Sequence, residues 1–235
     1  MNMILLSQSD FIDSDRAVIT GRRLEHLRCV LKVNPNDMLK IGLINGLTGC
    51  GQVLSIDQQK CELALVLNRQ PPKPLPCTLI MALPRPKTLK KSLEAAVVMG
   101  VKRIFIIESF RVEKSYWSSP VLEEKQLHKL SILALEQACD TMLPQIQMRR
   151  RFRPFVEDEL SLISPGAKLL TAHPGASLNT QADCKEPVVL IIGPEGGFIP
   201  FEIDLLEKQG CHTVSFSSRI LRVEHAVPAI LAKLF

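Results

Sequence analysis

The chain of 235 residues has few aromatic side chains: they make up 5% of the sequence, with one Trp and one Tyr. Proteins that bind single-stranded nucleic acid on exposed rings stack successive bases on several of them. The composition therefore disfavours an aromatic platform. Long apolar runs are also missing, because none reaches the ~18 residues of a membrane-spanning helix. The first residues lack the basic start and apolar stretch of a signal peptide.

Cysteines are present but scattered, at positions 29, 50, 61, 77, 139, 184 and 211. No two of them form a CxxC pair, which argues against a zinc ribbon or a thioredoxin-like motif. An odd number of separated thiols fits a reducing compartment better than a disulfide framework. We therefore expect a cytoplasmic protein with no membrane segment and no metal site.

The charge balance is mild. With 46% hydrophobic and 23% charged residues, the composition is that of a core-forming domain, and the formal net charge is +5. Such an excess permits a polyanionic partner without requiring one.

A proline-rich segment divides the chain. Residues 70–76 contain four prolines, which fix φ and remove backbone donors. This pattern predicts an extended connector between a first domain, residues 1–72, and a second domain, residues 73–235.

The first domain begins with a basic helix and continues as short strands. Residues 21–30 carry apolar Leu24, Leu27 and Val30 on one face, whereas Arg22, Arg23 and Arg28 lie on the other. Strands follow at 38–44, 51–56 and 61–67, a spacing typical of a small β-barrel that serves as a binding module. The basic face is either a nucleic-acid contact or a solvated surface.

The second domain alternates strands and helices. The predicted strands are 77–82, 103–108, 145–152, 168–172, 188–192 and 212–216, and the predicted helices are 88–99, 123–138, 201–209 and 224–234. This order predicts an α/β fold with a largely parallel sheet and helices on both faces. Ligands then bind where the strands end at their carboxyl side.

One of those strand ends is rich in glycine. Gly193-Pro194-Glu195-Gly196-Gly197-Phe198 follows an apolar strand. It is neither a P-loop nor the GxGxxG dinucleotide fingerprint. Three glycines in five residues indicate a tight turn or a close approach of a ligand to the backbone. The alternative is a plain turn between a strand and a helix.

A second charged segment follows the last strand. Arg219, Arg222, Glu224 and His225 lie within seven residues, just before an apolar helix. We expect Ile220 and Leu221 to anchor the segment in the core while its charges face outward. Alternatively, Glu224 only favours the helix start through the helix dipole.

GPEGGF followed by SRILRVEHA resembles the 16S rRNA uracil-N3 methyltransferases, a branch of the SPOUT superfamily, whose members read GPEGGFS and GRILRxETA. The earlier stretches Leu24–Lys32, Ala82–Arg85 and Glu136–Ala138 are similar to further motifs of that family. The usual EQSGR reads Glu136-Gln137-Ala138-Cys139-Asp140 here, and the usual ETA reads Glu224-His225-Ala226.

The resemblance implies a PUA-like β-barrel that binds RNA, a SPOUT domain with a deep trefoil knot, a homodimer, and S-adenosylmethionine bound in the knot. By this resemblance, the cofactor-binding residues are Leu83, Ala172, His173, Ile192, Gly193, Pro194, Gly196, Gly197, Ser217, Ile220, Leu221 and Ala226. The resemblance also implies that the partner is ribosomal RNA or the small ribosomal subunit.

The chemistry points to a few charged side chains. Uracil N3 carries a proton, so a site must stabilise the uracil anion with a cation and offer a base. Arg222 and Arg219 are the candidate cations, and Glu195 and Glu224 are the candidate bases or orienting groups.

Candidate RNA contacts are Arg22, Arg23, Arg28, Arg85, Arg149 and Arg151. On a strand, alternate arginines of the run 149–153 would face phosphate, or would protect a solvated sheet edge. Two functions stay open: a methyltransferase acting on uridine N3 of 16S rRNA, and a degenerate SPOUT protein that binds RNA or ribosome precursors without methyl transfer.

Overall fold

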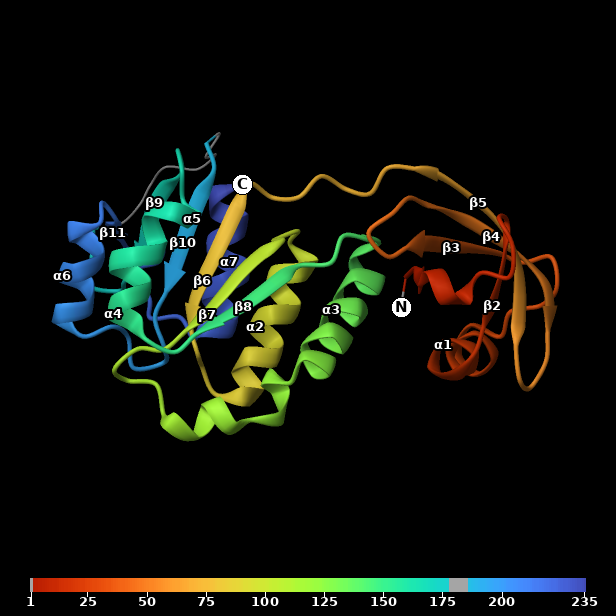
Figure 1. Ribbon diagram of the computed structural model, residues 1–235, viewed down its shortest axis with the longest axis horizontal. Coiled ribbons are helices and arrows are strands. Elements are labelled where there is room, and N and C mark those ends of the chain that lie inside the picture. Colours follow the sequence, from red (N-terminus) through yellow and green to blue (C-terminus); the bar gives the residue numbers. More distant parts are fainter. Residues whose placement is uncertain (1, 178–185) are drawn as a thin grey trace. The chain divides into compact units, whose positions relative to one another are not determined.

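The computed structural model describes residues 2–177 and 186–235, which form two compact units (Figure 1). Residues Met1–Lys73 and Ile132–Leu143 make up the first unit, and residues Pro74–Ser131 and Pro144–Phe235 the second. The division predicted from the prolines left residues 132–143 in the second domain, whereas they pack with the first unit.

The strands described in the first unit form one five-stranded sheet, in the order β1-β3-β4-β5-β2. Its strands are β1 (Ile4–Leu6), β2 (Arg16–Ile19), β3 (Met38–Leu43), β4 (Thr48–Ile56) and β5 (Cys61–Arg69). The pair β1–β3 is parallel and the other pairs are antiparallel. Both edge strands, β1 and β2, escaped sequence prediction because each has only three or four residues.

The basic helix of the first unit is shorter than predicted. α1 (Gly21–His26) continues as a π-helical turn, η2 (Leu27–Leu31). Leu24 and Leu27 are buried in the core, but Val30 is 64% exposed. The wider turn rotates the later residues away from the face that a regular helix would present. The prediction of one continuous apolar face is therefore wrong at its end.

The carboxyl half of α3 (Glu124–Ala138) completes the first unit. The backbone N–H groups of Asn2 and Met3 donate to the Glu136 carbonyl at 3.1 and 3.0 Å. After the helix, the Asn45 N–H donates to the Thr141 carbonyl at 2.8 Å.

A six-stranded parallel sheet forms the described part of the second unit, in the order β11-β9-β10-β6-β7-β8. Its strands are β6 (Cys77–Ala82), β7 (Arg103–Ile107), β8 (Gln145–Arg149), β9 (Lys168–Ala172), β10 (Val188–Ile192) and β11 (His212–Val214). The prediction of an α/β fold is confirmed. β10 lies between two strands that precede it in the chain, β6 and β9.

Helices cover both faces of this sheet, since all five residues of β10 are buried. The helices are α2 (Pro86–Val98), α4 (Phe152–Pro154), α5 (Leu160–Ile163), α6 (Pro200–Lys208) and α7 (Val223–Leu234). The second unit also has the short 3-10 helices η3 (Lys114–Ser118) and η4 (Pro120–Leu122) and the π-helix η5 (Phe155–Glu159). The first unit has the 3-10 helix η1 (Gln8–Asp10). The rings of Phe105 on β7 and Phe155 on η5 meet at 5.7 Å. Ile104 and Ile106, on the opposite face of β7, are also fully buried. α7 packs against α2.

The arginine run does not lie on one strand as predicted. β8 is an edge strand that ends at Arg149, and Arg151 precedes the short helix α4. The strand cannot continue because Phe152 and Pro154 enter helical turns, and proline has no N–H for a sheet ladder. In the described part of the chain, no helix is long and apolar enough to span a membrane.

Candidate functional site

A cavity of about 410 Å³ lies at the carboxyl ends of β9, β10 and β11. Residues after β9, the glycine-rich loop after β10, the segment after β11 and the first turns of α7 line it. Parallel sheets offer ligand sites at this edge because the loops after neighbouring strands meet there.

The glycine-rich loop needs its glycines for its geometry. The Gly197 N–H donates to the Pro194 carbonyl at 2.8 Å, and Gly197 has φ +71°, a conformation that L side chains rarely adopt. A Cβ on Gly193 would lie 3.2 Å from the Phe198 ring. The loop therefore presents bare backbone to the cavity.

The segment after β11 is held by its own polar groups. The Ser215 hydroxyl donates to the Ser217 carbonyl at 2.9 Å, and the Arg219 N–H donates to the Ser217 hydroxyl at 3.0 Å. Lys233 of α7 donates to the Phe216 carbonyl at 3.3 Å. These contacts shape the wall opposite the glycine-rich loop.

The apolar pair in this segment does not anchor it in the core. Ile220 is 86% exposed and lines the cavity, and Leu221 is only half-buried. The prediction of a core anchor is wrong, because serine hydroxyl groups and Lys233 hold the segment instead. An apolar side chain that stays exposed beside a cavity is available to pack against a ligand.

Two charged contacts tie the glycine-rich loop to neighbouring strand ends. The Arg85 N–H, before α2, donates to Glu195 Oε1 at 3.0 Å. The Arg111 guanidinium, in the loop after β7, donates to the Gly196 carbonyl. A hydrogen bond with Tyr116, together with attraction to Tyr116, Glu195 and Glu113, raises the pKa of Arg85 above its ordinary value.

The structure brings most of the predicted site residues together. Those that line the cavity are Ala172, His173, Ile192, Gly193, Pro194, Glu195, Gly196, Gly197, Ser217, Arg219, Ile220, Leu221, Arg222 and Ala226. Leu83 and Glu224 are not among its lining residues. Leu83 is buried, with its N–H bonded to the Ile107 carbonyl at 2.9 Å. Glu224 lies in the first turn of α7.

Sequence reasoning missed other lining residues, among them Arg111, Phe198 and Ile230. Arg111 belongs to no motif and reaches the site only because the loop after β7 passes the glycine-rich loop. Phe198 ends the motif itself, so its position after the last glycine was the available signal.

The predicted RNA-contacting arginines differ in their surroundings. Arg22 pairs with buried Glu136 at 2.8 Å while its own side chain stays 46% exposed. Arg23 is bound to Asp10 at 2.6 Å and to the Leu5 carbonyl at 2.7 Å. Arg28 is exposed.

The basic run of the second unit is also partly engaged. Arg149 pairs with Glu159 at 2.6 Å, whereas Arg151 is exposed.

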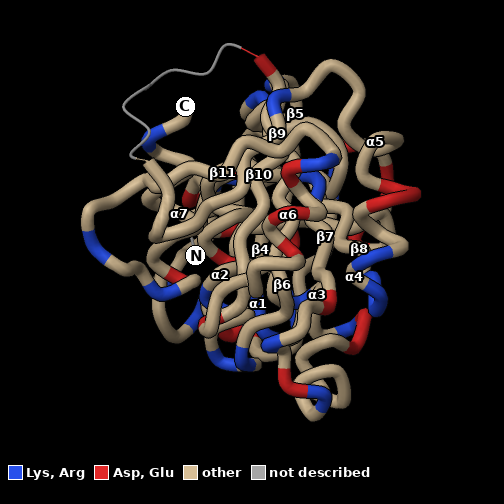
Figure 2. Tube along the Cα trace, turned by 90° about the vertical axis from the view of Figure 1, so that its left-hand side faces the viewer, with Lys and Arg blue, Asp and Glu red and all other residues tan. Residues whose placement is uncertain are grey.

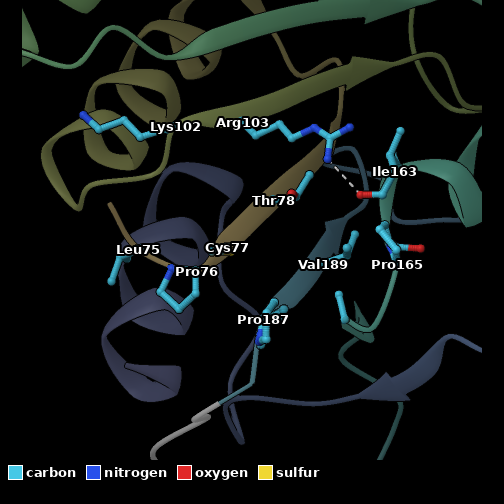
Figure 3. A pocket seen from close by; sticks show the side chains of 13 residues that line it. Leu75, Pro76, Cys77, Thr78, Lys102, Arg103, Ile163, Pro165, Pro187 and Val189 are labelled. Carbon is cyan, nitrogen blue, oxygen red and sulfur yellow. Dashed lines mark hydrogen bonds between the residues drawn. The ribbon is translucent and has the colours of Figure 1, made fainter. Parts of the chain in front are cut away.

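Another cavity, of about 320 Å³, lies at the opposite, amino-terminal edge of the sheet (Figure 3). Leu75, Pro76, Pro165 and Pro187 line much of it, and the Arg103 guanidinium beside them donates to the Ile163 carbonyl at 2.9 Å (Figure 3). Because this arginine is already bonded to the backbone, the edge offers less for recognition than the carboxyl edge does.

Two buried thiols of the second unit are poor nucleophiles. Burial raises the pKa of the Cys77 thiol to about 12 and that of Cys211 to about 11, which suppresses the thiolate. Within residues 2–177 and 186–235, His, Cys, Asp and Glu side chains do not gather in a group that could hold a metal ion. Cys184 lies outside the described residues.

The fold and this site define a class of protein. Residues 71–234 match the family model described as an RNA methyltransferase domain, so the chain belongs to that family. The resemblance to RNA methyltransferases predicted from the two motifs is confirmed.

Several proteins similar to this chain carry the same, more specific name. The chain is 28% identical over 240 residues to the ribosomal RNA small subunit methyltransferase E of Treponema pallidum, covering 99% of this chain and 90% of that protein. It is 23% identical to that of Borreliella burgdorferi, covering 97% and 95%. The fold is similar to the ribosomal RNA small subunit methyltransferase E of Neisseria gonorrhoeae bound to S-adenosyl methionine, with a TM-score of 0.77, 20% identity, and coverage of 99% and 95%.

Proposed function

We propose that the protein is an S-adenosylmethionine-dependent methyltransferase that methylates N3 of a uridine in small-subunit ribosomal RNA. The cavity at the carboxyl ends of β9, β10 and β11 carries this proposal. Its volume of about 410 Å³ suits a small-molecule ligand, and its walls join a bare glycine backbone to a segment with two arginines. Relatives that cover nearly the whole chain are named as small-subunit rRNA methyltransferases.

The lining fits the proposed cofactor. Bare backbone at Gly193, Gly196 and Gly197 leaves room for a close approach, and a Cβ on Gly196 would lie 3.0 Å from the Arg111 side chain. Exposed Ile220 and half-buried Leu221 offer apolar surface to an adenine ring. S-adenosylmethionine, when bound, supplies a methyl group on a positively charged sulfur.

The charged residues of this chain then act on the uracil. Arg222 directly precedes α7 and lines the cavity, and its guanidinium stabilises the negative charge that develops on the uracil oxygens when the N3 proton leaves. Arg219 lines the same wall. Glu195 holds the Arg85 N–H at 3.0 Å, so it orients the segment that carries Arg85 beside the site. Glu224, which directly follows the lining residues Arg222 and Val223, is the remaining candidate for the base that takes the N3 proton.

We also assign the finer features of the SPOUT class to this chain. A trefoil knot is supported by the position of β10 between the earlier strands β6 and β9 and by the packing of α7 on α2. A PUA-like, RNA-binding role of the first unit is supported by its five-stranded sheet and by exposed Arg22 and Arg28. A homodimer is supported by the resemblance of the two motifs to the SPOUT family, and a cytoplasmic location by the ribosomal substrate.

The test is a mass-spectrometric analysis of small-subunit rRNA nucleosides from cells that lack the protein and cells in which it is restored. We expect 3-methyluridine to be lost and then rescued. Isothermal titration with S-adenosylmethionine accompanies it. Binding of RNA without cofactor binding and without any change in 3-methyluridine would contradict the proposal and leave a non-catalytic RNA-binding protein.

Arg222→Ala gives a sharper prediction. We expect the rate of methyl transfer to fall by about a hundredfold or more, since removing one stabilising donor has an effect of that order. Cofactor affinity should change little, because the carbonyl of residue 222 still accepts from the His225 and Ala226 N–H groups. Lys208→Ala, at the exposed end of α6, is the matched control for the loss of one positive charge. Equal activity of both variants would remove Arg222 from the mechanism.

A further inference from the structure

A cavity of about 540 Å³, called the second cavity below, adjoins the 410 Å³ cavity of the candidate site, called the first cavity below. The second cavity has no part in the site described above. It lies beyond the carboxyl ends of β7 and β8 and before α6. Its apolar lining comes from Phe110, Val112, Phe152, Ile199 and Phe201. We propose that this second cavity binds an unpaired nucleotide of the RNA next to the one that is methylated. This inference rests on the proposed function and extends it to a new subsite.

Two aromatic rings stand exposed at the second cavity. Phe110 is 78% exposed and Phe201 is 55% exposed. Exposed rings of this kind are costly in water, and they offer faces on which any base can stack. The loop after β7 supplies one ring and the start of α6 the other.

A buried carboxylate joins those two elements. Glu202 is 3% exposed, and it accepts the Phe110 N–H at 2.8 Å and the Ile199 N–H at 3.0 Å. The loop that carries Phe110 is thereby fastened to the helix that carries Phe201. The backbone segments that carry the two rings are therefore held together before a ligand arrives.

Cations line the same cavity. Lys114, Arg150, Arg151 and Arg153 are exposed and contribute to its lining. Arg150 also lies over the Trp117 ring, 5.3 Å from its centre, and Arg153 pairs with Glu157 at 2.9 Å. Figure 2 shows Lys and Arg segments in blue beside the labels β8 and α4. Positive charge around apolar rings is the combination that binds a nucleotide, with the phosphate on the cations and the base on the rings.

One polar residue of the lining, Ser109, is buried behind the second cavity. The Ser109 side chain is 4% exposed, and its hydroxyl has no hydrogen-bond partner among the described residues. A buried hydroxyl without a partner is unfavourable. The oxygen itself is enclosed by the protein, so the stacked base is bound by the rings and the cations and not by Ser109.

The two cavities share a wall, which places the second next to the methylation site. The Phe198 ring lines the first cavity and lies 5.7 Å, centre to centre, from the Phe152 ring, which lines the second. Phe110 lines the second cavity, and the next residue, Arg111, lines the first. An RNA strand whose target base occupies the first cavity therefore has a neighbouring nucleotide within reach of the second cavity.

The experiment measures RNA binding and methyl transfer for the full-length protein and the Phe110→Ala/Phe201→Ala double variant. The probes are fluorescently labelled hexauridylate for binding and small-subunit rRNA for activity. We expect hexauridylate affinity and kcat/KM for rRNA to fall about tenfold or more, the scale of one lost base-stacking contact. Titration with S-adenosylmethionine should give the same affinity as the unaltered protein. Leu162→Ala, at a side chain that is 77% exposed and outside both cavities, is the matched control.

A second variant and a cross-link separate the possible outcomes. Ser109→Ala should weaken hexauridylate binding less than the double variant does, and irradiated 4-thiouridine RNA should attach to peptides that contain Phe110 or Phe201.

Unchanged hexauridylate affinity in an active double variant would overturn the subsite and leave the proposed function intact. A change of oligomeric state in the double variant, with RNA binding unaltered, would instead make the cavity an interface between copies and also overturn it. If the unaltered protein transfers no methyl group, the proposed function fails, and hexauridylate binding still decides the subsite.

Discussion

Gly197 and Gly166 have the same backbone conformation in different places. Their φ angles are +71° and +67°, and a Cβ on either would have no atom within 4 Å. An alanine at either position is therefore disfavoured by backbone strain alone and not by a clash. Only Gly197 lines the proposed cofactor cavity.

The pair gives a matched prediction. Gly197→Ala should weaken S-adenosylmethionine binding by about fivefold or more, because a strain of roughly 1 kcal/mol distorts the loop that faces the ligand. Gly166→Ala should lower thermal stability to a similar degree and leave binding unchanged. Calorimetric titration and thermal unfolding of both variants make the comparison. Equal affinity for the two would show that the loop backbone does not hold the cofactor.

Asp10 and Arg23 form an ion pair in the first unit, with side chains that are 11% and 19% exposed. Partial burial by itself raises the pKa of Asp10. Hydrogen bonds from Arg23 and Ser7 and the Arg23 charge outweigh it, so the pKa lies below the ordinary 3.8. A carboxyl group with a lowered pKa stabilises the fold above its unfolded pKa and loses that contribution as the pH falls through the folded value.

Asp10→Asn should therefore destabilise the protein by about 1.5–3 kcal/mol at pH 7, the range for a charge-assisted hydrogen bond. The difference from the unaltered protein should shrink as the pH falls below 3.8. Chemical unfolding followed by circular dichroism at several pH values measures it, with Asp204→Asn at an exposed position of α6 as control. A difference that persists unchanged at low pH would contradict a role for the charge.

The aromatic side chains show what composition can and cannot predict about single residues. A content of 5% argues against a long platform of rings, and that argument stands for rows of bases. Composition says nothing about which rings are exposed, and Phe110 and Phe201 stay in solvent while Phe105 and Phe155 are buried. Only their surroundings in the fold distinguish these phenylalanines.

At the scale of elements, α3 is the clearest case in which periodicity and packing differ. The sequence predicted the helix within one residue of its start, at 123 in place of Glu124. The pattern could not indicate that its carboxyl half packs with the first unit. Glu136, 1% exposed, pairs there with Arg22 at 2.8 Å, and the Thr141 hydroxyl donates to the Gly46 carbonyl at 2.6 Å.

Glu136→Ala tests this connection. We expect the free energy of unfolding to fall by about 1–3 kcal/mol, because a buried charge-assisted hydrogen bond disappears while the half-exposed Arg22 remains solvated. Faster hydrogen exchange should appear in residues 2–6, 21–31 and 132–143. Glu124→Ala, in the first turn of the same helix, should leave these segments protected. If hydrogen exchange changed to the same extent along the whole chain in both variants, the Glu136–Arg22 pair would have no local role.

The end of β8 is a second case at this scale. A run of arginines beside Phe152 reads as a strand, but the chain enters α4 and η5 instead, where Phe155 and Val156 are buried against the core. Tertiary burial of these apolar residues prevails over local strand preference. The turn moves Arg150 and Arg151 from a sheet edge to the rim of the second cavity.

At the scale of the whole molecule, the second unit derives its site from the order of its strands. The insertion of β10 between β6 and β9 brings the glycine-rich loop against Arg85 on one side and the residues after β9 on the other. Loops separated by more than a hundred residues thus share one cavity. The same arrangement sets the first and second cavities side by side.

The sequence by itself determined the approximate positions of the six strands of the second unit and of the helices α2, α3, α6 and α7, together with the two motifs that reveal an RNA methyltransferase. These are local properties, since periodicity, glycine spacing and proline act within a few residues. The tertiary structure alone decided that Arg111 reaches the glycine-rich loop, that Ile220 is exposed, that residues 132–143 pack with the first unit and that a second cavity adjoins the first. Those outcomes depend on which surfaces far apart in the chain bury one another, and no local pattern encodes that choice.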